Sequence, residues 1–364
     1  MIIVIGGNHH NTLGVIRSLG ERKIKSDVII HDCKKSFVVH SKFVRKKYLC
    51  TKDVIVQILI KEYAIENNKH IIICCSDISS SIVDLNKELL SERFILPGCI
   101  EHGRITSLMD KYIMSNIAVG CGITVPVSVT TNVADLSTRD DIVYPCILKP
   151  LLSIKGTKKN IHVCSKRKEL LSIINSIDNI HYQIQQFIEK EFEFQLIGCS
   201  LNYGKDVIIP AVSIIIRNGK NTNTGFLKIV PVTGFENIIE LSKSFIKKIG
   251  YQGLFSMEFL RGKDGSDYFM EINFRNDGNA YSVTASGTNL PYIWIMQNSN
   301  FEKEVNRIEQ PVYIMPELSD IKLIMLGKLK LTTWIKDINR TKSFLLFNRH
   351  DIKPFLFKLI YLIK

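Results

Sequence analysis

Short apolar runs alternate with helical patterns over the first hundred residues. Residues 2–5 are apolar, two glycines follow, and apolar residues then recur at helical spacing, which predicts a strand, a turn and a helix. Buried strands are also predicted at 28–31 and 71–74, with a helix at 54–66 between them. Because strands and helices alternate, we expect a doubly wound parallel sheet in an N-terminal domain of residues 1–108.

The first turn is disfavoured as a dinucleotide site. It begins Gly6-Gly7-Asn8 and continues with His9 and His10, so it lacks the glycine spacing of the GxGxxG motif. The histidine pair fits a polar turn better than a metal site.

The pattern changes near residue 108, beyond which strands predominate. The predicted elements are helices at 110–120, 168–177 and 238–249 and strands at 142–150, 161–164, 182–188 and 193–199. We therefore expect an α+β region after the parallel sheet.

The stretch 253–275 predicts a β-hairpin. Asp264-Gly265 between two alternating runs is the signal of a two-residue turn, in which Lys263 pairs with Ser266. This register places apolar side chains opposite one another on one face: Phe255 and Phe274, Met257 and Ile272, Phe259 and Met270. That face is therefore predicted to be core.

The other face of the hairpin gathers oxygen ligands. Ser256 lies opposite Asn273 there, and Glu258 lies opposite Glu271. Two carboxylates this close repel each other unless a cation neutralises them, and with the amide oxygen of Asn273 they form a set that suits Mg²⁺. Arg275 continues the face and would hold an anion. The alternative is a solvated face on which arginine and nearby lysines offset the glutamates.

A strand-end lysine precedes a loop of small and basic residues. Lys149 ends an apolar strand before Pro150, where an ammonium group needs an anionic partner. The loop 153–158 adds hydroxyl, amide and ammonium groups, but it is not a Walker A loop. Beside a magnesium site these groups indicate phosphate binding. The alternative is a surface lysine and an ordinary loop.

The order of a helix-start lysine (Lys111), a strand-end lysine, a small-residue loop and a carboxylate hairpin resembles the ATP-grasp superfamily over nearly the whole chain. The resemblance implies an α/β plus α+β fold, in which a parallel-sheet N-terminal (pre-ATP-grasp) domain precedes a two-subdomain ATP-grasp clamp. The expected domains are 1–108, a first subdomain at 109–184, a second subdomain with the metal site at 185–310, and a basic amphipathic C-terminal segment at 311–364.

The resemblance also implies the metal ligands and the groups around the reacting phosphate. Glu258 would bind one Mg²⁺, Glu271 would bridge two, and Asn273 would complete the second, with Mn²⁺ able to replace Mg²⁺. Arg275 would contact the reacting substrate and Lys228 would lie near the γ-phosphate, both in catalytic roles.

Further positions match the family's ATP site. The implied ATP-binding residues are Lys111 and Lys149 at the phosphates, Ser153, Gly156 and Thr157 in the covering loop, Gln185, Gln186, Phe187 and Ile188 at the adenine hinge, and Glu193, rather than Glu191, at the ribose.

Residues 13–20 and 41–48 look like the branch of the superfamily that contains D-aspartate ligase and the carbamoyl-phosphate-synthase-like ligases. The implied activity is that of an ATP-dependent carboxylate–amine ligase, which forms an amide through an acyl phosphate from small-molecule carboxylate and amine substrates. Two alternatives stay open: activation of bicarbonate or another small acid, and a nucleotide-binding module without catalysis.

Composition adds a basic excess. The chain has 364 residues, with 48 Lys+Arg against 35 Asp+Glu and a net charge of +13, which favours anionic partners. Nucleic acid is disfavoured because no aromatic-interleaved basic groove or recognition motif is present. The nine cysteines are dispersed and never spaced CxxC, so we expect buried thiols in a reducing cytoplasm. Neither a signal peptide nor a membrane-spanning helix is predicted.

The C-terminal segment carries a large share of this charge, since residues 310–364 hold ten Lys/Arg against four Asp/Glu. Residues 343–364 interleave aromatic and aliphatic side chains with basic ones, which is typical of an interfacial helix on an anionic lipid surface. We therefore expect a cytoplasmic protein whose tail touches the inner membrane face, or a tail helix that packs on the second clamp subdomain. A homodimer is also left open.

Overall fold

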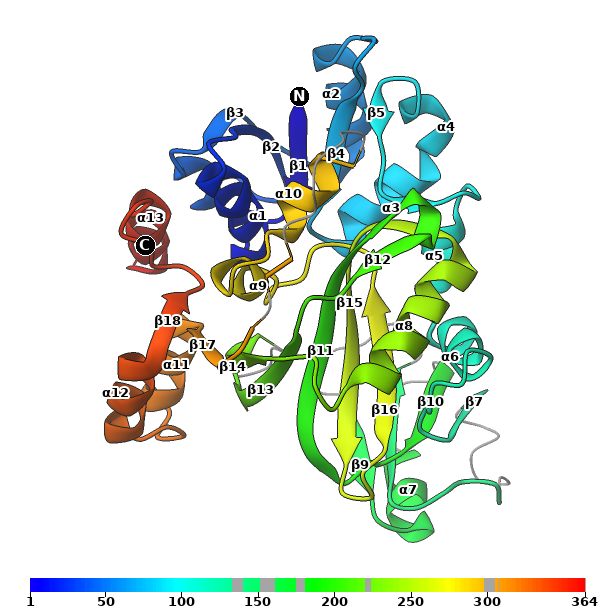
Figure 1. The fold of residues 1–364 in the computed structure, drawn as a ribbon. Coiled ribbons are helices and arrows are strands. Elements are labelled where there is room, and N and C mark those ends of the chain that lie inside the picture. The colour runs from blue at the N-terminus through cyan, green and yellow to red at the C-terminus, as the bar shows by residue number, and fades with distance from the viewer. Residues whose placement is uncertain are drawn as a thin grey trace. The chain divides into compact units, whose positions relative to one another are not determined.

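The fold is described from a computed structural model (Figure 1). The residues that the structure describes are 1–132, 140–150, 161–174, 181–219, 224–297, 305–306 and 308–363. They form two compact units, which we call the large unit (Met1–Ser107, Phe194–Met257 and Ile272–Lys364) and the small unit (Leu108–Glu193 and Glu258–Glu271). The four-part domain division stays a prediction.

The predicted parallel sheet is confirmed in the large unit. Its strands are ordered β3-β2-β1-β4-β5, and all four pairings are parallel. They span Ile2–Gly6 (β1), Ser26–His31 (β2), Val44–Cys50 (β3), His70–Cys74 (β4) and Phe94–Ile95 (β5). The chain runs outward in one direction from β1 to β3 and in the other from β4 to β5. The carboxyl ends of β1 and β4 are therefore the switch point where ligands bind in such sheets.

Helices cover both faces of this sheet, because side chains alternate along its strands. Ile3 and Ile72 pack on one face, among apolar side chains from the helices that follow β3 and β4. Val4 and Ile73 pack on the other face. The helices and 3₁₀ turns of this part are His10–Glu21 (α1), Val38–His40 (η1), Lys52–Val54 (η2), Ile55–Glu62 (α2), Asp77–Leu85 (α3), Lys87–Leu90 (α4) and Arg104–Leu108 (α5).

A larger sheet of nine strands continues the fold within the described residues. Its main path is β16-β15-β11-β13-β14-β17-β18, with β12 beside β11 and β6 beside β15. The strands span Gly98–Cys99 (β6), Lys190–Leu201 (β11), Asp206–Ile208 (β12), Val212–Asn218 (β13), Gly225–Val230 (β14), Tyr251–Gly262 (β15), Asp267–Asn273 (β16), Val312–Met315 (β17) and Thr341–Phe344 (β18). The remaining helices are Asn202–Gly204 (η5), Glu236–Ile249 (α8), Tyr281–Ala285 (α9), Leu290–Ile295 (α10), Glu317–Met325 (α11), Leu331–Arg340 (α12) and Lys353–Ile363 (α13).

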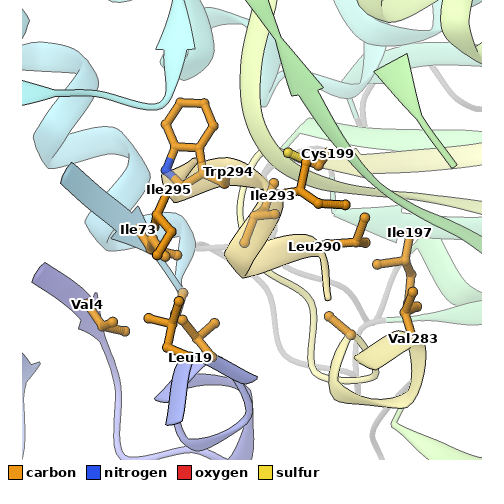
Figure 2. Packing of buried hydrophobic residues seen from close by; sticks show 14 of the residues in the cluster. Val4, Leu19, Ile73, Ile197, Cys199, Val283, Leu290, Ile293, Trp294 and Ile295 are labelled. Carbon is orange, nitrogen blue, oxygen red and sulfur yellow. The ribbon is translucent and has the colours of Figure 1, made fainter. Parts of the chain in front are cut away.

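Helix α10 joins the two sheets of the large unit into one core (Figure 2). Trp294 is 1% exposed, and its indole N–H donates to the carbonyl of Ile72 in β4 at 3.0 Å. Ile73 of β4 and Ile197 of β11 belong to the same apolar cluster. Burying a side chain of this size stabilises the fold by roughly 1.5–3 kcal/mol.

The small unit contains a four-stranded antiparallel sheet ordered β7-β10-β8-β9. Its elements are Lys111–Val119 (α6), Ser128–Asn132 (β7), Cys146–Pro150 (β8), His162–Cys164 (β9), Arg167–Ile174 (α7) and His181–Gln186 (β10). Asp110 caps α6 by accepting from the backbone N–H groups of Tyr112 and Ile113, which confirms the predicted helix start. Leu148 and Leu170 share an apolar cluster, so one face of β8 packs beneath α7.

The predicted two-residue turn of the β15–β16 hairpin is wrong. The N–H of Gly262 donates to the carbonyl of Ser266 at 2.9 Å, and the N–H of Gly265 donates to Gly262 at 3.0 Å. The loop is therefore one residue longer than predicted. Gly265 has a φ of +80°, which glycine adopts without strain and which closes a three-residue loop. Arg261 accordingly forms an ion pair with Asp267 across the strands.

An irregularity in β16 restores the predicted register farther from the turn. The rings of Phe259 and Phe269 lie 5.6 Å apart, so Phe259 packs on Phe269 and not on Met270. The next buried residue of β16 after Phe269 is Ile272. Two residues therefore lie between these buried positions, whereas regular strand alternation would leave one. We attribute this spacing to a bulge, in which Met270 and Glu271 together oppose Glu258.

The C-terminal segment differs from both predictions for it. It is not one interfacial helix, because it begins as strand β18 and ends as α13. Phe355, Phe357 and Tyr361 of α13 pack against the cluster formed by α1, β2 and η1 of the parallel layer, and not on the second clamp subdomain. The His40 ring stacks on Phe357 at 3.4 Å between centroids. The apolar residues of this face thus cover core, which does not support a membrane role for them.

A buried ion pair ties the same segment to α1. Arg17 and Asp351 have side-chain exposures of 0% and 1%, and Nε of Arg17 lies 3.1 Å from Oδ2 of Asp351. The Ser41 hydroxyl and the Lys42 backbone N–H also donate to this carboxylate, at 2.8 and 3.0 Å. The carboxylate is thus fully enclosed by donors.

Among the described helices, none is long and apolar enough to cross a membrane. All nine cysteines are free thiols, and six of them are buried.

We expect Asp351→Ala to lower the free energy of unfolding by about 3–5 kcal/mol, because it leaves the Arg17 guanidinium buried without its partner. Urea denaturation at pH 7 measures the change. Asp53→Ala, at an exposed position, serves as the control and should stay within about 0.5 kcal/mol of the wild type. A loss below about 1 kcal/mol for Asp351→Ala would contradict the anchoring role.

Candidate functional site

The centre of the candidate site is Lys149 on β8. Antiparallel pairing sets Lys149 beside Gln183 of β10, and Gln185 lies two residues farther along that strand. The two glutamines are 2% and 5% exposed. The Lys149 ammonium donates to Oε1 of Gln185 at 2.8 Å. Because Leu148 packs in the apolar cluster on the other face, strand alternation places Lys149 on a polar face of this sheet.

The charges around Lys149 are unusual for a buried lysine. Its pKa is lowered to about 8, chiefly by burial and then by the ammonium of Lys111, whereas the carboxylate of Glu271 opposes this shift. Lys111, Lys149 and Glu271 therefore lie within electrostatic range of one another, although they come from α6, β8 and β16. Two cations held against one carboxylate leave a positive centre that suits an anion such as phosphate.

The oxygen ligands predicted on the hairpin fit Mg²⁺ by chemistry. Strands β15 and β16 are hydrogen-bonded neighbours, and Glu258, Glu271 and Asn273 are all half-buried. The side chains of Asn273 and Ser256 meet at 3.4 Å, as the predicted register requires. Carboxylate and amide oxygens are the hard donors that Mg²⁺ prefers. Among the described residues, no group of three or more His, Cys, Asp or Glu side chains is placed to hold a metal ion, so this set would have two carboxylates and one amide.

Arg275 is held at the switch point of the parallel sheet. Its Nε donates to Oδ1 of Asp77, at the start of α3, over 2.7 Å, and its Nη2 donates to Oδ1 of Asn273 over 2.9 Å. Asp277 lies 3.5 Å from the same guanidinium. Three neighbours therefore fix a side chain that the sequence placed on an open hairpin face.

A pair of buried amides holds this strand end in place. Asn11 and Asn276 are 5% and 3% exposed. Asn11 Nδ2 donates to the carbonyl of Asn276 at 2.7 Å, and Asn276 Nδ2 donates back to Oδ1 of Asn11 at 2.5 Å. The backbone N–H of Asn276 donates to the Cys74 carbonyl at 3.0 Å. Sequence reasoning missed Asn11, Asp77 and Asn276, and only the polar run after Arg275 gave a signal.

The predicted adenine hinge spans the end of β10, with Gln185 and Gln186, and the two residues that follow the strand. The backbone N–H groups of Gln186 and Phe187 already donate to the carbonyls of Val127 and Pro145, at 2.7 and 2.8 Å. Ile188 is buried, whereas Phe187 is 39% exposed. Glu193 is half-buried at the start of β11 and forms an ion pair with Lys190.

Four predicted site residues remain: Lys228, Ser153, Gly156 and Thr157. Lys228 lies within β14 in the large unit, with Ile214 and Tyr313 as its strand neighbours. Ser153, Gly156 and Thr157 lie outside the described residues.

Comparison with known sequences gives one relative of interest, whereas no family model matches the chain. The chain is 23% identical over 252 residues to the D-aspartate ligase of Enterococcus faecium (strain Aus0004). The match covers 64% of this chain and 59% of the relative, so it spans less than two thirds of that protein.

Solved structures show the fold. The biotin carboxylase domain of the Hydrogenobacter thermophilus 2-oxoglutarate carboxylase, solved with MgADP, ADP and bicarbonate, has a TM-score of 0.65 at 18% identity over 85% of this chain and 73% of that one. The L-amino acid ligase from Bacillus licheniformis has a TM-score of 0.61 at 16% identity over 84% of this chain and 77% of that one. The chain thus has the ATP-grasp fold that its motifs predict.

We expect Lys149→Met to stabilise the protein in the absence of a ligand. A lysine whose pKa falls from 10.5 to about 8 lowers the stability of the folded state at pH 7 by about 3 kcal/mol at most, and the lost bond to Gln185 reduces the gain to about 1–3 kcal/mol. The penalty is complete below pH 8 and disappears as the pH rises from about 8 toward 10.5.

Thermal or urea unfolding at pH 7 and pH 10 measures this change, with exposed Lys166→Met as the control. The variant's advantage should shrink at the higher pH. A variant that is less stable than the wild type at pH 7 would show that Lys149 has a structural role.

Proposed function

We propose that this ATP-grasp chain is an ATP-dependent carboxylate–amine ligase. A substrate carboxylate oxygen attacks the γ-phosphorus of ATP, and the bond from this phosphorus to the β–γ bridging oxygen breaks. The products of this step are ADP and an acyl phosphate. An amine then attacks the acyl carbon, releases inorganic phosphate and a proton, and forms an amide. No nucleophilic side chain is needed, because positioning and electrostatics supply most of the catalysis of phosphoryl transfer.

The observation that carries this proposal is the buried ammonium of Lys149. Lys111 acts on it as a like-charged neighbour, and Glu271 acts on it with the opposite charge. A bound phosphate would neutralise this excess and restore the ordinary pKa of Lys149. Such an unfavourable arrangement in the free protein is typical of a ligand site.

In this proposal each group has a distinct task. Lys111 and Lys149 bind the phosphates of ATP, and the loop with Ser153, Gly156 and Thr157 covers them. The hinge 185–188 contacts adenine through its backbone, and Glu193 contacts the ribose.

The metal ligands and the catalytic residues have the remaining tasks. Glu258, Glu271 and Asn273 would hold two Mg²⁺ ions, or Mn²⁺ in their place, which would supply charge neutralisation at the transferring phosphate. Arg275 binds the carboxylate or acyl phosphate, since Asp77 and Asn273 already fix its guanidinium. Lys228 is proposed near the γ-phosphate on the family resemblance alone.

The relatives support amide formation. D-aspartate ligase and L-amino acid ligase are names of amide-forming or peptide-forming enzymes, and the substrates of this chain are small molecules in the same proposal. Contact with a membrane through residues 343–364, a location at the inner membrane face and a homodimer stay predictions. A cytoplasmic location is likewise inferred only from the sequence.

A second candidate is the activation of bicarbonate or another small acid without amide formation. The carboxylase domain solved with bicarbonate favours it. Mass spectrometry of products from Mg-ATP, amino acids and ¹³C-bicarbonate separates the two activities. An amide without ¹³C supports the ligase, and a ¹³C-carboxylated product supports the second candidate. A nucleotide-binding module without catalysis would give neither product.

We expect Glu271→Ala to lower ATP turnover by at least about 100-fold, because it removes a proposed bridging metal ligand. The measurement is phosphate release with Mg-ATP and pools of amino acids. Exposed Glu92→Ala should keep the wild-type rate. Equal rates for Glu271→Ala and the wild type would refute the metal assignment.

A further inference from the structure

A cavity of about 250 Å³ lies within the large unit, and none of the residues predicted to bind ATP or metal lines it. At about 30 Å³ per water molecule, its volume corresponds to roughly eight waters, or a small organic molecule. Its walls come from the turn after β1 with His9 and His10, from Phe37 before η1, from Thr224 before β14, and from the C-terminal segment with Glu317 and Lys358.

The cavity has an acidic wall formed by Glu317. This residue begins α11 and is 6% exposed. Its Oε1 accepts from the backbone N–H of Phe347, whereas its Oε2 is buried and has no hydrogen-bond partner in the part of the chain that the structure describes. A buried carboxylate oxygen left without a donor is unfavourable, so a donor from a ligand would stabilise it.

The cavity also has a basic wall formed by Lys358. Its ammonium lies 4.9 Å from the centre of the Phe37 ring, and burial lowers its pKa. It is close enough to His9 and His10 to lower the pKa of both imidazoles. Within the described ranges, Lys358 forms no ion pair with a carboxylate, so its charge is available to an anion.

His9 adds a hydrogen-bond donor to the basic wall. Its Nδ1 accepts from the backbone N–H of Asn11 at 3.2 Å, so in the neutral ring the proton lies on Nε2. Burial lowers the pKa of His9 to about 4, and the ring is therefore neutral at pH 7. Nε2–H and the Lys358 ammonium are both suited to a carboxylate.

We propose that this cavity binds a small zwitterion, whose ammonium group is held by Glu317 and whose carboxylate is held by Lys358 and His9. Apolar side chains of Pro316, Leu345 and Leu346 line the space around the ligand's aliphatic part. Free amino acids, with the amine at the α position or farther along the chain, have this chemistry.

The cavity also has an electrostatic link to the candidate site. Asp277 and Arg275 both influence the pKa of His9, so the cavity lies beside the strand end that holds Arg275. The identification of the zwitterion as the amine substrate of the ligase rests on the proposed function. Binding itself requires neither ATP nor turnover, so the two proposals can fail separately.

Isothermal titration calorimetry of the full-length protein without ATP at pH 8 tests the site. The probes are glycine, β-alanine, D-aspartate and L-lysine, with methylamine and acetate as probes that carry one charge. We expect at least one amino acid to bind at least about tenfold more tightly than either singly charged probe, because two charged walls act on it together.

Two variants locate the binding, and both should weaken it by at least about tenfold: Glu317→Gln, which keeps the acceptor for Phe347, and Lys358→Met. Their matched controls are exposed Glu309→Gln and Lys353→Met, which should bind as the wild type does. Far-ultraviolet circular dichroism and thermal unfolding establish that each variant is folded. If a variant is unfolded, the titration of that variant is replaced by a competition titration on the wild type, in which acetate competes with the amino acid.

The pH dependence of amino acid affinity is a further test, because a purely structural role of Glu317 would not change it. Burial raises the pKa of Glu317 to about 7, against backbone hydrogen bonds from Glu317, Phe347 and Leu346 and the charge of Arg17, so the wild type should lose affinity as the pH falls from 8 to 6. The other titratable groups at the cavity are His9, His10 and Lys358. Glu317→Gln should lack this loss.

Equal affinity for amino acids and acetate, or unchanged binding by both variants, would overturn the proposal. Amino acid binding that depends on Glu317 and Lys358 in a protein without ATP turnover would uphold the cavity and refute the proposed function. If both variants turn over ATP with an unchanged KM for the amine, the proposed function is upheld and the cavity is refuted as the amine site.

Discussion

The end of strand β16 is fixed by a reciprocal hydrogen bond between two buried amides, Asn11 and Asn276. A buried amide must satisfy its donors and acceptors within the protein, and these two do so with each other and with the carbonyl of Cys75, which accepts from Asn11 at 2.9 Å. The strand end is thereby held at the carboxyl ends of β1 and β4. The positions of Arg275, Asp277 and the cavity beside His9 all depend on this attachment.

Two buried charges make the free protein less stable than its core would allow. Lys149 lies in the small unit beside a second cation, and Glu317 lies in the large unit with one oxygen that lacks a donor among the described residues. Burial lowers the pKa of Lys149 and raises the pKa of Glu317, because it disfavours the charged form of either group. In both cases a ligand of opposite charge would remove the penalty, so at both proposed sites binding would raise the stability.

Much of the fold follows from local pattern. Strands β1, β2 and β4 and helix α6 form where apolar runs and an aspartate cap predict them, because burial and capping act within a few residues. The hairpin shows the limit of such reasoning. Its strands are correctly predicted, but the turn is one residue longer and Phe269 takes the core position predicted for Met270, and the bulge to which we attribute this shift accounts for the position of Asn273 beside Ser256. Turn length depends on how both strands pack, and so it is not a property of Asp264-Gly265 alone.

The sequence by itself predicted the ATP-grasp fold, which the solved structures bear out, and it singled out the oxygen-bearing side chains on β15 and β16 and Lys149 as site candidates, because these inferences depend on residue types at short spacings. The tertiary structure alone decided where the C-terminal segment packs, since Asp351 meets Arg17 across 334 positions of the chain. It also decided that Asn11 and Asn276 would meet, 265 positions apart, and that His9, Glu317 and Lys358 would line one cavity. Contacts of this kind form only when the whole core closes, and no local pattern encodes their partners.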